Sequence, residues 1–315
     1  MIDFVCNRDK TTFGEQASIK LLVFPEMALC GGNYPLGLKG RRRSLKEGLE
    51  VSIEIPGPET DLIAQKSIEH GVYICCGCFE KDSKYPNIHF NSAFITNPQG
   101  KIILKYRKIN STNNMFELCQ SPHSILDIYK EDPLPVVSTK IGKLAVGICY
   151  DLEFPELWRA YALKGAEIFL HPNGGMSDYR IAQARARAID NMAYFLSANM
   201  GPFTNSGGMT GGMGKSIAID FMGNVIAETS ESGEQMAYVS INLRALRAAR
   251  SQRWFNRLAH ITTEIYKGMY DEPLWPKNTC IDYPVPETLA DVWKHGDKAV
   301  ENLKKRFKKA HCYVE

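Results

Sequence analysis

The sequence lacks any long hydrophobic run and any strong excess of one charge. No stretch approaches the ~20 apolar residues that a transmembrane helix needs, and residues 1–10 contain no apolar core of a secretory signal. The 38 Lys and Arg residues nearly balance the 35 Asp and Glu residues, which leaves a formal net charge of +3. The sequence therefore favours neither a nucleic acid nor a membrane as a partner.

The nine cysteines do not form the framework of a disulfide-rich protein. Their number is odd and their spacing is irregular, so the simplest interpretation is a reduced, cytoplasmic protein. Cys75 and Cys78 make a C-x-x-C pair, but no second pair stands at the spacing of a zinc site. Residues 71–80, GVYICCGCFE, also fit a buried strand in which cysteine behaves as a small apolar residue. We therefore expect no metal.

The chain has 315 residues, 44% of them hydrophobic, which is enough for one large core or two smaller ones. Many of its apolar runs are apolar on both faces, as in strands that are covered on both sides. Runs of strand length occur at residues 20–24, 72–79, 92–96, 101–105, 144–148, 167–170, 193–198 and 215–220. Helical patterns occur at residues 59–70, 156–164 and 180–193, and hairpin turn signals at 97–100 and 220–224. This mixture of connections predicts an α/β protein with mixed sheets.

Three chemically distinct side chains each follow a predicted strand. Glu26 comes after the first run and a proline, Lys108 follows the fourth run, and Cys149 follows the fifth. Strand ends can converge at one edge of the sheets in an α/β protein. A thiol is largely un-ionised at pH 7, so a nucleophilic cysteine needs activation, and the acids after Cys149 do not supply it. The spacing in the sequence does not by itself show that the three residues meet.

In three blocks the chain resembles the nitrilase superfamily, the carbon–nitrogen hydrolases. The blocks stand in the order of the family: VFPE at 23–26, KYRK at 105–108 and GICYDLEFPE at 147–156. Shorter matches lie at 91–93 and 187–191, and the resemblance extends from about residue 15 to residue 245.

The resemblance implies both a fold and a chemistry. It implies an α-β-β-α sandwich, a homodimer or larger homo-oligomer, no cofactor, and a small-molecule amide as the substrate. Carried over by motif, Glu26 is the general base, Lys108 stabilises the tetrahedral intermediate and Cys149 is the nucleophile. The backbone N–H of Tyr150, paired with Lys108, is then the oxyanion site.

Two further residues are candidates for binding the substrate or the oxyanion. Many members of the superfamily carry a second glutamate between the Lys and Cys blocks, and Glu117 is the nearest match. His171, expected in the loop after the run at 167–170, is a candidate for lining the pocket, with a hydrogen-bonded structural histidine as the alternative. A papain-like pair of Cys149 and His171 is a further alternative, but it leaves the Glu26 and Lys108 motifs unexplained.

The Tyr-Asp pair after the cysteine resembles the amidase and carbamoylase branches, whereas true nitrilases tend to have Trp-Glu there. We therefore expect hydrolysis of a small amide or an N-carbamoyl compound with release of ammonia, and a nitrile is the alternative substrate. Residues 110–136 form an unusual insertion that is expected to shape the pocket. The natural substrate is therefore not indicated.

Both ends of the chain raise expectations of their own. Members of the superfamily normally begin with a strand that is not recognisable in the 25 residues before Glu26. A truncated, non-catalytic relative that acts as a binding or scaffold protein is therefore kept as an alternative. After residue 250 the sequence becomes rich in aromatic residues. We expect a hydrolase domain at 1–250 and an extension at 251–315 that packs on the body or on a neighbouring subunit.

Overall fold

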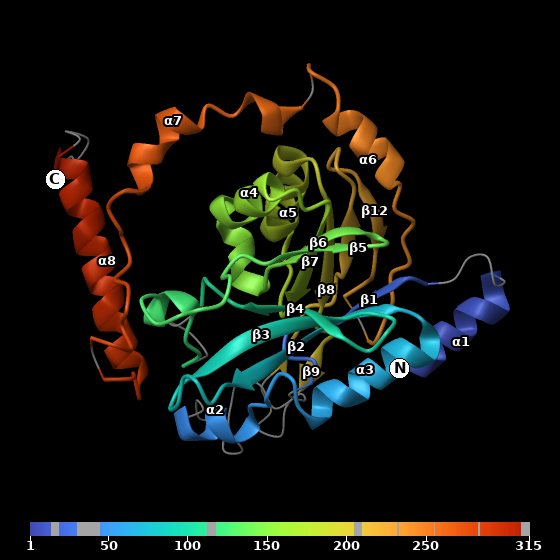
Figure 1. Cartoon of the computed structure of the whole chain (residues 1–315), viewed down its shortest axis with the longest axis horizontal. Helices are drawn as coiled ribbons and strands as arrows, with labels where there is room; N and C mark the ends of the chain where they lie inside the picture. Colours follow the sequence, from blue (N-terminus) through green and yellow to red (C-terminus); the bar gives the residue numbers. More distant parts are fainter. Residues whose placement is uncertain are drawn as a thin grey trace.

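Two β-sheets stack face to face, and helices cover their outer faces, in the computed structural model of the chain (Figure 1). The structure describes residues 1–13, 19–29, 45–111, 118–204, 210–231, 233–254, 256–282 and 284–309.

The first sheet has four strands in the order β1-β2-β3-β4. Its strands are β1 (Leu21–Val23), β2 (Tyr73–Lys81), β3 (His89–Thr96) and β4 (Ile102–Arg107). β1 is parallel to β2, whereas β3 is antiparallel to both β2 and β4. β1 and β4 therefore run in the same direction, and their carboxyl ends reach the same edge of the sheet.

The second sheet has six strands in the order β12-β11-β8-β7-β6-β5. Its strands are β5 (Val136–Thr139), β6 (Gly142–Val146), β7 (Ile168–Asn173), β8 (Tyr194–Asn199), β11 (Ile217–Ile219) and β12 (Val225–Glu228). The central strands β6, β7 and β8 are parallel. A separate two-stranded sheet pairs β9 (Phe203–Thr204) with β10 (Thr210–Gly211).

Helices on both sides complete the sandwich (Figure 1). On the first sheet lie α1 (Ile2–Phe13), α2 (Leu45–Val51) and α3 (Pro58–His70), and on the second lie α4 (Pro155–Leu163) and α5 (Asp178–Asn191). α6 (Leu243–Arg250) lies at the amino end of β7, where its Arg247 pairs with Glu167. α3 and α4 each begin with a proline, whose fixed φ suits the first turn of a helix. The predicted α-β-β-α sandwich is therefore confirmed.

The main core lies between the two sheets and continues beneath α4 and α5. Cys75 and Ile95 of the first sheet belong to the same buried cluster as Phe169 of the second sheet and Trp158 of α4. Gly147 makes room for this packing, because a Cβ at that position would lie 2.6 Å from the Trp158 ring. The strand that leads to Cys149 can therefore lie directly against α4.

Most of the predicted elements are observed with boundaries shifted by a few residues. The hairpin turn at 97–100 joins β3 to β4, and the Asn97 side chain accepts from the backbone N–H groups of Gln99 and Lys101. β5 differs from the expectation, because its first residue, Val136, was assigned to the insertion at 110–136. β5 is an edge strand of intermediate burial, so its sequence lacks the strongly apolar pattern of the central strands.

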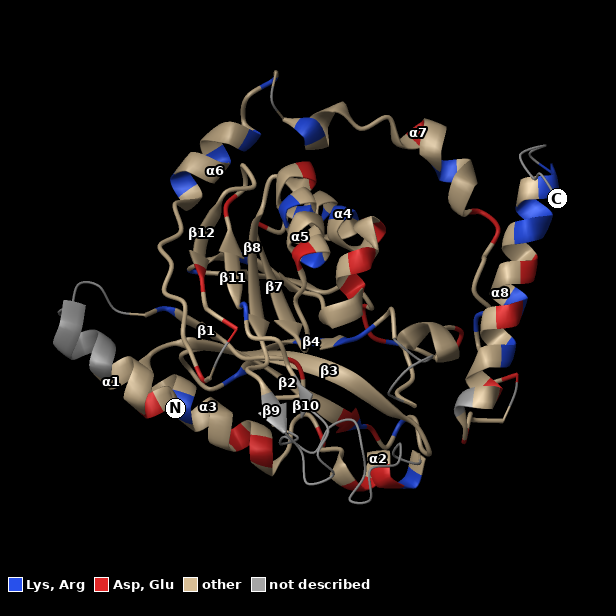
Figure 2. Ribbon diagram, turned by 180° about the vertical axis from the view of Figure 1, so that it is seen from behind, with Lys and Arg blue, Asp and Glu red and all other residues tan. Residues whose placement is uncertain are grey.

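The chain after α6 arcs around the body before it ends in a long helix (Figure 1). This part contains η4 (Arg257–His260), α7 (Thr263–Tyr266), η5 (Lys267–Tyr270) and α8 (Leu289–Lys309). Residues of both charges alternate along α8 (Figure 2). Between η5 and α8 the backbone is fixed to the body, because the Cys280 N–H donates to the Ser124 carbonyl at 2.9 Å. None of the helices in the described parts of the chain has the length and apolar composition to cross a membrane.

Candidate active site

Glu26 and Lys108 form a buried ion pair at the shared edge of β1 and β4. The Lys108 Nζ lies 2.8 Å from the Glu26 Oε1, and the two side chains are only 1% and 3% exposed. Asn91 of β3 joins them, since its Nδ2 donates to the same Oε1 at 2.7 Å and its carbonyl accepts the Lys108 N–H at 2.8 Å. A buried charge needs such partners to offset the loss of hydration. The parallel direction of β1 and β4 thus brings together two residues that are far apart in the sequence.

Lys108 and its neighbour Arg107 have different partners, although both are fully buried. The Arg107 guanidinium pairs with Glu80 and Asp82 and lies over the Phe90 ring at 4.3 Å. Arg107 is therefore held in a structural network of the first sheet. Of these two neighbouring cations, Lys108 is the one that faces Glu26.

A glycine of β2 allows the turn that carries Glu26 to lie against the sheet. A Cβ on Gly77 would lie 2.7 Å from the Met27 nitrogen and 3.0 Å from the Pro25 oxygen. These contacts are with backbone atoms, which cannot move aside as a flexible side chain can. The sequence analysis treated residue 77 only as part of a cysteine-rich strand, so this role was missed.

Cys149 follows β6 at a sharp turn into the short 3₁₀ helix η3 (Cys149–Glu153), and α4 begins two residues later. Its φ of 47° lies in the left-handed region, which costs a residue other than glycine about 1–3 kcal/mol. Strain of this size persists only where the surroundings fix the backbone. The turn exposes part of Cys149, whereas most of the other described cysteines are buried.

Asp151 fixes this turn to the end of β4. Its fully buried carboxylate accepts from the Ile148 N–H at 2.8 Å and from the Tyr106 hydroxyl at 2.7 Å. It also accepts from the backbone and side-chain nitrogens of Asn110, each at 3.0 Å. Burial raises the pKa of this carboxyl group in spite of these donors. Because Tyr106 and Asn110 flank Lys108 in the sequence, Asp151 couples the position of the lysine to that of the cysteine.

The Cys149 sulfur lies in an environment of mixed charge. Burial and the Glu26 carboxylate raise the pKa of the thiol to about 11, against the opposing effects of the Lys108 and Arg180 cations. The Gly174 N–H hydrogen-bonds to the sulfur, and a Cβ on Gly174 would lie 3.0 Å from the Glu26 Oε2. The thiol therefore holds its proton at neutral pH and needs a base, and a carboxylate adjoins the same glycine.

His171 contacts the backbone of Cys149. It is fully buried within β7, not in a loop as the sequence analysis expected. Its Nε2 lies 3.0 Å from the Cys149 carbonyl oxygen, and its Nδ1 lies 2.9 Å from the Ser197 hydroxyl. A carbonyl only accepts, so Nε2 carries the proton and Nδ1 accepts from Ser197. Burial lowers the pKa of His171 to about 3, so the ring is neutral. This arrangement disfavours a papain-like pair, in which a histidine must face the sulfur.

The two remaining candidates differ in how far the structure describes them. Tyr150 is the second residue of η3, so its N–H precedes the first hydrogen-bonded turn and has no acceptor within the helix. Its ring packs edge-on against Phe154 at 5.2 Å between centroids. Glu117 lies outside the described residues.

Cys75 and Cys78 do not form a shared site. Both are fully buried in β2, and an odd separation along a strand places two side chains on opposite faces. Cys75 accordingly belongs to the core between the sheets, and Cys78 to a cluster that includes Ile63 of α3. Both behave as the small apolar residues that the sequence analysis expected.

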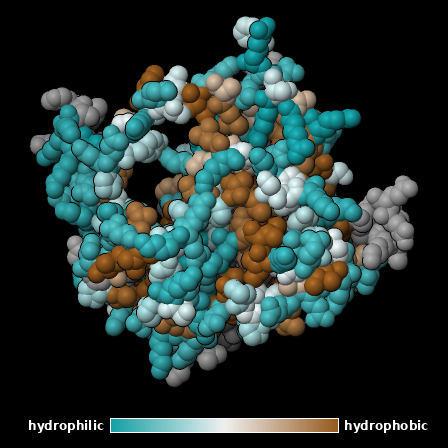
Figure 3. All heavy atoms as spheres, in the orientation of Figure 1, coloured by the Kyte–Doolittle hydropathy of each residue, from teal (hydrophilic) through white to brown (hydrophobic). Residues whose placement is uncertain are grey.

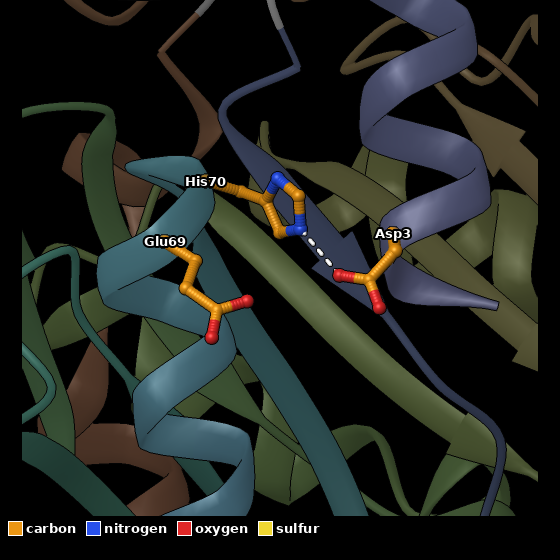
Figure 4. Close-up of side chains that lie close together, drawn as sticks. All are labelled: Asp3, Glu69 and His70. Atoms are coloured by element: carbon orange, nitrogen blue, oxygen red, sulfur yellow. Dashed lines mark hydrogen bonds and ion pairs between the residues drawn. The ribbon is translucent and has the colours of Figure 1, made fainter.

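Asp3, Glu69 and His70 gather where α1 meets α3 (Figure 4), with possible metal-ligating atoms within 4.8 Å of one another. The Lys66 ammonium lies 2.9 Å from the Asp3 carboxylate and 2.7 Å from that of Glu69. A lysine therefore already supplies the positive charge that a metal ion would bring. We interpret the cluster as an ion-pair network that joins the two helices.

The comparisons with known proteins agree on one family. The sequence model of the family described as carbon-nitrogen hydrolase matches residues 13–251. The omega-amidase NIT3 of Saccharomyces cerevisiae is 28% identical over 242 residues, which are 75% of this chain and 79% of that protein. A formamidase of Bacillus cereus is 35% identical over 190 residues, which are 58% of this chain and 50% of that protein.

Solved structures are similar in fold. A carbon–nitrogen hydrolase from Helicobacter pylori superposes with a TM-score of 0.66 at 21% identity, over 85% of this chain and 92% of that one. The crystal structure of Saccharomyces cerevisiae Nit3 gives a TM-score of 0.61 at 22% identity, over 82% of this chain and 90% of that one. Because the family model covers most of the sequence and the fold agrees, this chain belongs to the carbon–nitrogen hydrolase family of the nitrilase superfamily.

Proposed function

We propose that this carbon–nitrogen hydrolase cleaves the C–N bond of a small amide through a thioester on Cys149. The observation that carries the proposal is the buried pair of Glu26 and Lys108 beside a strained cysteine whose thiol is protonated at neutral pH. Attack of such a thiol on an unreactive amide carbon at neutral pH needs a base that takes its proton, and a carboxylate next to a cation fits that role.

The first half of the reaction forms the thioester. Glu26 takes the thiol proton, and the proton transfer is assigned to Oε2, the oxygen next to Gly174. The sulfur attacks the amide carbon, and the carbonyl electrons move onto the oxygen. The Lys108 ammonium and the Tyr150 N–H stabilise this oxyanion, an effect typically worth about 3–4 kcal/mol for one donor. The tetrahedral intermediate collapses, the C–N bond breaks, and Glu26 returns the proton to the leaving nitrogen.

The second half restores the enzyme. A water molecule takes the place of the departed ammonia, and Glu26 accepts its proton while the oxygen attacks the thioester carbon. A second oxyanion forms at the same donors and collapses with cleavage of the C–S bond. Glu26 returns the proton to the sulfur, and a carboxylic acid leaves. These steps consume one water and need no cofactor.

Small amides are the favoured substrate class because the similar proteins are named omega-amidases and a formamidase. N-carbamoyl compounds use the same steps and are the nearest alternative. A nitrile is a further alternative, since a thiol adds to a nitrile carbon as well. A non-catalytic scaffold is the alternative of a different class.

An ammonia-release assay tests the proposal. The full chain is incubated with short amides, N-carbamoyl amino acids and nitriles, in parallel with Cys149→Ala. We expect release from an amide by the wild type and none by the variant. Equal release from both proteins, or no release from any compound, contradicts the proposal. Intact-mass detection of a single iodoacetamide adduct at Cys149, formed faster than at the other cysteines, argues against the scaffold alternative.

We further propose a hydrolase body at 1–250 and an extension at 251–315 that covers a second copy of the chain in a homodimer or larger assembly. Large hydrophobic side chains of the extension are exposed: Trp254 by 77%, Ile265 by 74% and Tyr270 by 67%. Figure 3 also shows hydrophobic residues uncovered in the middle of the face that the extension borders. Light scattering of the full chain tests this, with Ile265→Lys expected to lower the mass of the assembly.

The free cysteines support a cytoplasmic location.

A further inference from the structure

Two side chains from different elements meet at the carbonyl oxygen of Cys149. His171 of β7 donates from Nε2 at 3.0 Å, and Arg180 of α5 donates from Nη2 at 3.0 Å. We call His171 and Arg180 the carbonyl clamp. The reaction steps above use neither residue.

Each member of the clamp is itself held in place. The Ser197 hydroxyl fixes the His171 ring at 2.9 Å, and the Gly175 carbonyl accepts from the Arg180 Nη1 at 2.9 Å. The histidine is a neutral donor, whereas the guanidinium is a charged donor, which makes the stronger hydrogen bond. The clamped carbonyl therefore has two anchored donors, one from the second sheet and one from the helix that covers it.

The clamp determines the direction of another group in the same peptide unit. A trans peptide is planar, and its C=O and N–H point in opposite directions. The carbonyl of Cys149 and the N–H of Tyr150 belong to one such unit. Holding the carbonyl therefore also sets the direction in which the Tyr150 N–H points.

The backbone at this point does not hold that direction without help. Cys149 has a φ of 47°, in a region that side chains other than glycine rarely adopt. Rotation about the N–Cα bond of Cys149 toward a negative φ would relieve the strain, and it would swing the Cys149 carbonyl together with the Tyr150 N–H to a new direction. Donors on the carbonyl oppose that rotation, because it would leave His171, a buried polar group, without its acceptor.

We propose that His171 and Arg180 are positioning residues that hold the Tyr150 N–H toward the oxyanion. The inference rests on the proposed function, in which Tyr150 is an oxyanion donor. It assigns His171 a role behind the reacting peptide in place of direct contact with the substrate. It also adds Arg180, which no motif of the sequence indicated.

Two reactions of Cys149 separate this role from a structural one. Acylation by p-nitrophenyl acetate passes through an oxyanion. Its rate constant is measured from the burst of released p-nitrophenol. Alkylation by iodoacetamide is a direct displacement and forms no oxyanion. Both reactions start from the same thiolate, so the ratio of their rate constants at one pH is independent of the thiolate fraction. This matters for Arg180, whose Nη2 lies 4.0 Å from the sulfur and affects its ionisation.

We expect His171→Met and Arg180→Met each to lower the ratio of acylation to alkylation by about tenfold or more. His171→Gln, which keeps an N–H donor, restores part of the ratio. Arg185→Met is the matched control, because Arg185 lies on the same helix and donates to the Gly223 carbonyl at 2.8 Å. For Arg185→Met the ratio of acylation to alkylation is expected to stay at the wild-type value. For amide hydrolysis the two clamp variants lower kcat more than they change KM.

An unchanged ratio of acylation to alkylation in both Met variants overturns the proposal. This includes the case in which both rate constants fall equally, which is the result expected of a merely structural role. If His171→Met does not fold, Arg180→Met decides, since Arg180 is only partly buried. A wild type that is acylated by the ester but hydrolyses no amide refutes the proposed function and still tests the clamp. A wild type that the ester does not acylate at Cys149 refutes both.

Discussion

The Tyr106 hydroxyl donates to the Asp151 carboxylate at 2.7 Å, and this bond joins the strand before the lysine to the turn of the cysteine. Tyr106 lies at the end of β4, two residues before Lys108, and Asp151 lies two residues after Cys149. Both residues are almost fully buried. Asp151 thus has a structural role, which explains why a carboxylate stands so close to the proposed nucleophile without activating it.

Tyr106→Phe tests this relationship. Removing the hydroxyl leaves the buried Asp151 carboxylate with one donor fewer, which we expect to lower the free energy of unfolding by about 1–3 kcal/mol. It also loosens the position of Lys108 relative to Cys149, so kcat falls about tenfold or more. Urea unfolding and the ammonia assay measure the two effects.

Tyr194→Phe is the matched control for this prediction. Tyr194 is also buried, and its hydroxyl accepts from the Asn242 N–H at 3.2 Å, at the amino end of β8. We expect a comparable loss of stability with little change in kcat. If both variants lose kcat to the same degree, the bond between Tyr106 and Asp151 has no special part in the site.

Glu26→Gln is expected to change two reactions in opposite directions. The carboxylate raises the pKa of the Cys149 thiol, and the pKa is about 11 with this charge present. Removing the charge lowers that pKa, so at pH 8 the thiolate fraction and the rate of iodoacetamide alkylation increase. Hydrolysis loses the proposed general base, and we expect kcat to fall by about 10²–10⁴-fold. Rates of alkylation from pH 7 to 11 and ammonia release measure the two changes.

Lys108→Met is expected to slow alkylation of the Cys149 thiol, the opposite of the change expected for Glu26→Gln. The cation lowers the thiol pKa, so its removal shifts the alkylation profile to higher pH while hydrolysis also falls. The pair of variants thus separates activation of the thiol from its ionisation. Unchanged alkylation by Glu26→Gln at pH 8 would mean that the carboxylate does not face the sulfur.

Gly174→Ala is expected to impair catalysis by moving Glu26. The new Cβ would lie 3.0 Å from the Glu26 Oε2, which is closer than an ordinary contact. We expect a loss of kcat of about tenfold with little change in the unfolding midpoint, because the displaced group is the end of a side chain. Gly175→Ala is the control, since the nearest atom to its Cβ would be the Met213 sulfur at 3.8 Å. Equal activity of the two variants contradicts this prediction.

The three candidate residues at strand ends could be recognised in the sequence because the signal for each lies in a few consecutive residues. An acid, a lysine and a cysteine each follow a strongly apolar run, and the parallel course of β1 and β4 then brings Glu26 and Lys108 together. The α/β class with mixed sheets was predictable because apolar strands and helical patterns alternate along the chain, whereas the α-β-β-α sandwich was expected from the resemblance to the nitrilase superfamily. The weakly patterned edge strand β5 was not predictable.

The supporting residues were not predictable, because their roles depend on distances between elements. Gly77 and Gly174 are required by close approaches that no spacing reveals. Arg180 stands in a helix with two other arginines that bind different carbonyls, Arg185 that of Gly223 and Arg187 that of Leu152, so an arginine in this pattern does not by itself indicate a contact with Cys149. His171 was recognised as a candidate, but only its contact with the Cys149 carbonyl distinguishes an anchoring role from a pocket-lining one.

His171 also predicts how stability depends on pH. Its pKa is lowered to about 3 by burial, whereas a histidine in an unfolded chain has a pKa of about 6.5. Below pH 6.5 the unfolded state therefore binds one proton that the folded state does not, and acid favours unfolding. The contribution of His171 is fully present above pH 6.5 and is lost by up to about 1.4 kcal/mol per pH unit as the pH falls toward 3.

A comparison of wild type with His171→Gln isolates this contribution, because the other acidic and basic groups are common to both proteins. Urea unfolding at pH 7.5, 6, 5 and 4 gives the difference in the free energy of unfolding at each pH. We expect the wild type to be the more stable protein at pH 7.5 and its advantage to shrink by about 1 kcal/mol per unit below pH 6. A difference that stays constant across this range would mean that His171 is not held neutral between Ser197 and the Cys149 carbonyl.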